Sequence, residues 1–90
     1  MAPFDTSIMK LVVFASDLVK DFEVLARSRP DDPATTEAIE RYQDLLDTAR
    51  EALMKQGDPY PLKDAKEGIT NSGLFTLAGA LNSSLKAAVL

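Results

Sequence analysis

The segment "SRPDDPATTEAIERYQDLL" (residues 28–46) decides the fold, because it places two prolines three positions apart in a sequence that otherwise favours helix. Pro30 disfavours helical backbone angles at the residue before it, so it ends the preceding helix near Ser28. Pro33 suits the first position of a new helix, where its missing N–H is no loss. Asp32 then takes the N-cap position, where its carboxylate can accept from free backbone N–H groups. The segment predicts a helix end followed closely by a helix start.

Apolar residues on both sides of this turn recur at intervals of three and four, which is the period of one helix face. They predict a first helix over residues 6–28 and a second over residues 33–56, which Gly57 ends. Because the connection is short, the two helices should form an antiparallel hairpin. The apolar positions are Ile8, Leu11, Val12, Ala15, Leu18, Val19, Phe22 and Leu25 in the first helix, and Ala38, Ile39, Tyr42, Leu45, Leu46, Ala49, Ala52 and Leu53 in the second.

The last third of the chain predicts a connector over residues 57–73 and a third helix over residues 74–89, with Asn71 or Ser72 as its cap. The connector has room for a short extra helical turn near 62–67. The alternative is one tilted helix from Leu62 onward, which two glycines disfavour. We therefore expect a single all-α domain over residues 1–90, an antiparallel hairpin plus a C-terminal helix that together form a small three-helix bundle.

The composition excludes several classes of function. The net charge of −4 over 90 residues argues against nucleic-acid binding, which depends on clustered Lys and Arg. The chain has no cysteine and no histidine, so it lacks thiolate chemistry and the commonest general base and metal ligand near neutral pH. Asp31 and Asp32 have no third ligand at a recognisable spacing. We expect no catalytic residue, no cofactor and no metal site; an enzyme using only carboxylate or lysine chemistry is the alternative.

The distribution of apolar residues also bears on location. No apolar run approaches the eighteen or so residues of a membrane span. The first residues lack the basic head and the small-residue cleavage site of a secretory signal. We expect a soluble, cytoplasmic chain.

The C-terminal helix is rich in small residues interleaved with leucines, and its one charged residue is Lys86. A helix with so little charge is hard to cover with one hairpin. We therefore expect a non-enzymatic interaction or assembly module, a structural or adaptor subunit that self-associates, most simply as a homo-oligomer, or binds a protein partner. The candidate interface consists of Leu74, Phe75, Leu77, Leu81, Leu85 and Val89, with Met9, Val13 and Phe14, which lie off the main stripe of the first helix, as its second half. On this hypothesis Leu81→Asp dissociates an oligomer but leaves the helices intact. The alternative is that the third helix is ordinary core.

The segment "LARSRPDDPATTEAIERYQDLL" resembles the turn of type III secretion needle subunits, helical hairpins whose helices are joined by a Pro-x-Asp/Asn-Pro turn. Pro30, Asp32 and Pro33 match that motif, and Tyr42 and Gln43 extend the likeness, which covers about a quarter of the chain. The resemblance implies a filament-forming subunit of a secretion apparatus as an alternative function. Beyond Gly57 the chain departs from needle subunits, because a segment with prolines and glycines interrupts the helix.

Overall fold

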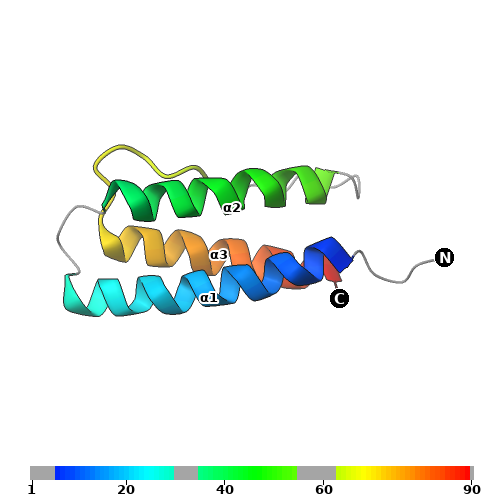
Figure 1. The fold of residues 1–90 in the computed structure, drawn as a ribbon, viewed down its shortest axis with the longest axis horizontal. Coiled ribbons are helices and arrows are strands. Elements are labelled where there is room, and N and C mark those ends of the chain that lie inside the picture. The colour runs from blue at the N-terminus through cyan, green and yellow to red at the C-terminus, as the bar shows by residue number, and fades with distance from the viewer. Residues whose placement is uncertain (1–5, 30–34, 55–62, 90) are drawn as a thin grey trace.

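The computed structural model describes residues 6–29, 35–54 and 63–89, and these form three helices and a connector (Figure 1). Helix α1 spans Thr6–Ser28, α2 spans Thr36–Met54 and α3 spans Asn71–Val89. The predicted all-α fold and its antiparallel hairpin are confirmed: α1 runs opposite to α2. Helix α3 runs in the same direction as α2, so the start of α1 and the end of α3 lie at one end of the bundle.

The starts of α2 and α3 are each capped by a threonine. The Thr35 hydroxyl accepts from the backbone N–H of Ala38 at 3.2 Å, so α2 begins at Thr36 and not at the predicted Pro33. The prolines and aspartates of the turn, residues 30–34, lie outside the described residues. In the same way the Thr70 hydroxyl accepts from the N–H of Gly73 at 3.1 Å, so α3 begins at Asn71, earlier than predicted.

The connector differs from the prediction. Residues 63–66 are not helical, and residues 66–69 form a tight turn in which the N–H of Ile69 donates to the carbonyl of Lys66 at 3.1 Å. Gly68 takes a φ of 78° in this turn, a left-handed conformation that suits glycine at the third position of a type II turn. The predicted helical turn near 62–67 is therefore absent from its described part, residues 63–67. Leu62 itself lies outside the described residues.

The connector is fixed to the outside of α2 by polar contacts. The buried Tyr42 hydroxyl donates to the carbonyl of Lys63 at 2.5 Å. Asp64 accepts two hydrogen bonds from the Arg50 guanidinium, at 2.8 and 3.3 Å, and a longer one from the Gln43 amide. The Arg50 contact holds the pKa of Asp64 below its usual range, with Gln43 adding to it. Burial raises the pKa of Tyr42. These contacts lead the chain back along α2 to the start of α3.

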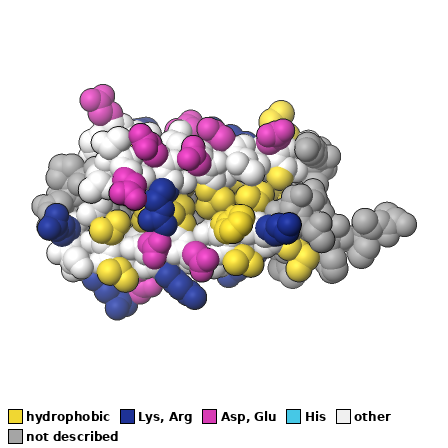
Figure 2. All heavy atoms as spheres, in the orientation of Figure 1, with side chains coloured by type: hydrophobic (Ala, Val, Ile, Leu, Met, Phe, Trp, Pro, Cys, Tyr) yellow, Lys and Arg dark blue, Asp and Glu magenta, His cyan; other side chains and the backbone are white. Residues whose placement is uncertain are grey.

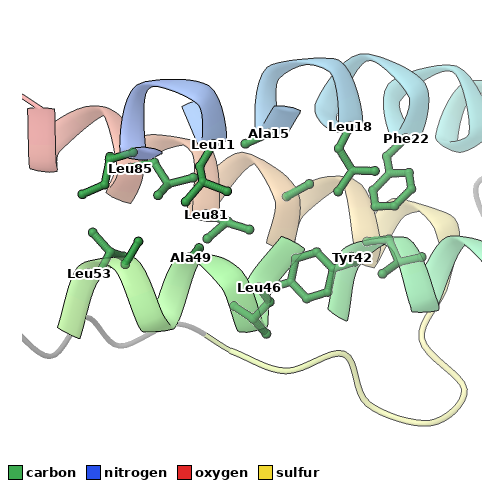
Figure 3. Packing of buried hydrophobic residues seen from close by; sticks show 14 of the residues in the cluster. Leu11, Ala15, Leu18, Phe22, Tyr42, Leu46, Ala49, Leu53, Leu81 and Leu85 are labelled. Atoms are coloured by element: carbon green, nitrogen blue, oxygen red, sulfur yellow. The ribbon is translucent and has the colours of Figure 1, made fainter. Parts of the chain in front are cut away.

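The core lies on the axis of the bundle, where the inner faces of all three helices meet (Figure 3). Helix α1 packs most extensively against α3, and its contacts with α2 are fewer. The buried residues are Ile8, Leu11, Ala15, Leu18 and Phe22 from α1, Ala38, Tyr42, Leu46, Ala49, Ala52 and Leu53 from α2, and Leu74, Ala78, Leu81 and Leu85 from α3. Asn71 at the start of α3 is linked to the end of α1, because its buried amide donates to the carbonyl of Arg29 at 3.0 Å.

Candidate interaction surface

The structure separates the predicted interface residues into two groups. Leu74, Leu81 and Leu85 are at most 1% exposed, so they belong to the core and are not available to a partner. Phe75 and Leu77 are half-buried and pack against the same core, while the side chain of Val89 lies outside the described residues. The apolar stripe of α3 therefore faces α1 and α2. These three leucines were expected at a docking surface, and in this chain they pack in the core instead.

The second predicted group lies on the surface. Phe14 and Val13 are each 58% exposed and Met9 is 46% exposed, all on α1. Val24, which follows on the same helix, is 64% exposed and was not among the predicted interface residues. Large apolar side chains with this much exposure on one helix are candidates for contact with another molecule. Among the predicted interface residues, those on α1 are therefore the most exposed.

Phe14 stands at the edge of a groove between α1 and α2. The groove has a volume of about 450 Å³, and its floor is made by Leu11 and Leu18 from α1 and Leu45 from α2. Figure 2 shows apolar side chains gathered between these two helices, with Asp and Glu side chains on either side. Helix α1 packs less extensively against α2 than against α3, and the Phe14 ring in this groove is more than half exposed.

One end of the groove is marked by Arg41, which reaches from α2 across to α1. Its guanidinium is 2.7 Å from the carboxylate of Asp21 and lies over the Phe22 ring, 6.0 Å from the ring centroid. Both charged side chains are about half exposed, so the pair contributes little to stability. Its effect is geometric, because the long arginine side chain bridges the two helices there.

The walls of the groove carry unpaired negative charge. Asp17 of α1 and Asp44 of α2 line its two sides and are exposed. Within the described residues neither carboxylate has an ion-pair partner. The outer face of α2 adds more acidic side chains, namely Glu37, Glu40, Asp47 and Glu51, all exposed. A ligand that fits here has an apolar centre and positive charge at its edges.

A second hollow, of about 960 Å³, lies between the connector and the start of α3, with Gly68, Ile69 and Leu77 in its lining. Its wall includes Lys63, which directly follows a segment outside the described residues.

No candidate metal site is found in the described part of the chain. Among these residues no group of three or more acidic side chains lies close enough to hold a metal ion. None of the described helices is long and apolar enough to cross a membrane. No family model, no curated protein and no solved structure matches the chain. The resemblance to needle subunits concerns a two-helix hairpin, and here a third helix packs on that hairpin. Any proposal about function therefore depends on the surface of this chain alone.

Proposed function

We propose that the chain is a non-enzymatic interaction module that binds an amphipathic helix of a partner protein in the groove between α1 and α2. The observation that carries the proposal is the exposed Phe14 ring beside an apolar floor of leucines, between the exposed carboxylates of Asp17 and Asp44. This is the general form of helix-in-groove recognition, in which apolar side chains at helical spacing enter a hydrophobic groove.

The charges favour one class of partner. Asp17 and Asp44 on opposite walls would repel an acidic helix and attract lysine or arginine beside its apolar stripe. The acidic outer face of α2 extends the same preference beyond the groove. The chain itself contains no strongly basic helix among its described elements, which favours a different protein as the occupant. The partner is therefore a basic amphipathic helix.

The proposal is tested with two synthetic helical peptides that share one leucine stripe at i, i+3, i+4 and i+7. One carries lysines beside the stripe, and the other carries glutamates at the same positions. Isothermal titration calorimetry should show binding of the lysine peptide, with an affinity at least about tenfold above that of the glutamate peptide.

Two variants locate the binding site. Phe14→Ser should weaken binding of the lysine peptide by about tenfold or more, as expected for an aromatic anchor at an interface. Val24→Ser is the matched control, because Val24 is exposed to a similar degree on the same helix but does not line the groove. Equal binding of the two peptides, no binding of either, or equal effects of the two substitutions would each refute the proposal.

A further inference from the structure

The outward face of α1 carries a second feature, which shares Asp17 with the wall of the groove. Val13, Asp17, Lys20 and Val24 are all exposed and follow one another at spacings of four, three and four. On a helix with 3.6 residues per turn these positions fall within about 60° of one another. They lie on the side opposite the buried Ala15 and Phe22. They form a narrow line along α1, which we call the outer seam.

The outer seam is complementary to its own reverse, because its order is apolar, acidic, basic, apolar. If a second copy of α1 lies antiparallel on it, Val13 meets Val24 of the second copy and Asp17 meets Lys20 of the second copy. The two-fold axis then repeats both contacts, as an isologous interface requires. A parallel arrangement would instead place Asp17 on Asp17 and Lys20 on Lys20 of the second copy, which like charges disfavour.

The charges of the seam are free to make this contact. Within the described residues, neither Asp17 nor Lys20 has an ion-pair partner in its own chain. The two valines are more than half exposed, and Met9 adds another exposed apolar side chain one turn before Val13. The seam thus has both complementary charge and uncovered apolar surface. We propose that α1 pairs with α1 of a second copy of this chain, antiparallel, along the outer seam.

The proposed interface is short and should be weak. The four seam positions extend over about 16 Å of helix. The next layer brings Lys10 near Arg27 of the second copy, two like charges, although Arg27 is already 2.7 Å from Glu23 in its own helix. A contact of this size belongs to the class of weak, reversible associations below about 1,200 Å². Dimerisation would engage Asp17 of the groove wall but leave the Phe14 ring accessible, because Phe14 lies about 100° around the helix from Val13.

The test uses charge exchange, read as the mass of the full chain by sedimentation equilibrium up to millimolar concentration, with no peptide present. Asp17→Lys and Lys20→Asp should each weaken dimerisation by about tenfold, since each creates two like-charge contacts across the two-fold axis. An equimolar mixture of the two variants should recover dimerisation, because each variant supplies the charge that the other lacks. The double variant Asp17→Lys/Lys20→Asp should also recover it.

Phe14→Ser is the matched control and should leave the dimer unchanged, while helical circular dichroism verifies that each variant is folded. A monomer at every concentration would overturn the proposal. A dimer that ignores the single charge changes, or a mixture that fails to recover, would overturn the antiparallel register. Since no outcome depends on peptide binding, the test is independent of the proposed groove function.

Discussion

Replacing Leu81 by alanine distinguishes a core helix from a docking helix. Leu81 is 1% exposed and lies between α1 and α2, where Figure 3 shows it among Leu11, Leu85 and Ala49. Removing three buried carbon atoms costs the transfer free energy of those atoms plus that of the cavity they leave, together about 2–5 kcal/mol. A chain of 90 residues has a total stability of about 5–13 kcal/mol. One substitution should therefore remove a large fraction of it.

The size of the effect can be checked by heat and by urea. At about 3 kcal/mol, the Tm of a domain of this length should fall by roughly 12–24 °C. The midpoint of urea unfolding, followed by circular dichroism at 222 nm, should fall with little change in slope, because the folded state keeps its architecture. Leu81→Asp should unfold the chain altogether, since it would bury an unpaired carboxylate.

The matched control is Phe14→Ala. It removes more atoms than Leu81→Ala, but from a side chain that is 58% exposed, so it should change stability by only about 0.5 kcal/mol. If Leu81→Ala left the Tm near that of the wild type and lowered the molecular mass instead, the placement of α3 in the core would be refuted. The leucines of α3 would then form an intermolecular interface.

Two further measurements test the connector and α3. Gly68→Ala should destabilise the chain by about 1 kcal/mol, because a φ of 78° strains a residue with a side chain. Gly79→Ala should stabilise it by about 0.5–1 kcal/mol, since the added methyl meets no atom within 4 Å and alanine favours helix. Equal effects of the two substitutions would contradict this difference in backbone conformation. The folded-state pKa of Asp64 is lowered, so Asp64 contributes stability that is present above its unfolded pKa of about 3.8 and is lost as pH falls through the folded-state pKa. The folded-state pKa of Tyr42 is raised, so Tyr42 contributes stability that is lost as pH rises above about 10. Urea titrations at a series of pH values give the free energy of unfolding as a function of pH. Its slope at acid pH should be shallower in Asp64→Asn, and its slope at alkaline pH should be shallower in Tyr42→Phe. Unchanged slopes would show that these contacts do not persist in solution.

The sequence is sufficient for the fold class because its signals are local. Apolar spacing and Pro30 predict a first helix over residues 6–28, and α1 has these bounds. The start of α2 is harder to predict, since Asp32 and Thr35 are both good caps within one short segment. Which residue caps the helix depends on the backbone N–H groups that its side-chain oxygen reaches in the folded chain. The Thr35 hydroxyl accepts from the N–H of Ala38.

The candidate site could be predicted only in part. The position of Phe14 off the apolar stripe of its helix identifies it as a surface residue. Its neighbour Leu45 belongs to the regular stripe of the second helix and is indistinguishable from core by spacing. The groove is lined by residues of both α1 and α2, so it depends on how the two helices pack together and not on the pattern of either helix alone. For the same reason, an apolar stripe on α3 fits an intramolecular and an intermolecular partner equally well.

The pairing of the first helix with the last has a consequence for how the chain reaches its native state. Ser16 and Asn82, whose side chains meet at 3.5 Å, are 66 positions apart, so the most extensive helix pair closes most of the polypeptide into a loop. Folding rates fall as the sequence separation of native contacts rises, so this chain should refold more slowly than helical bundles with only neighbouring contacts. During synthesis, α1 and α2 emerge before the 19 residues of α3. Until those residues leave the ribosome, the first helix lacks most of its native contacts, and its apolar face is available to chaperones.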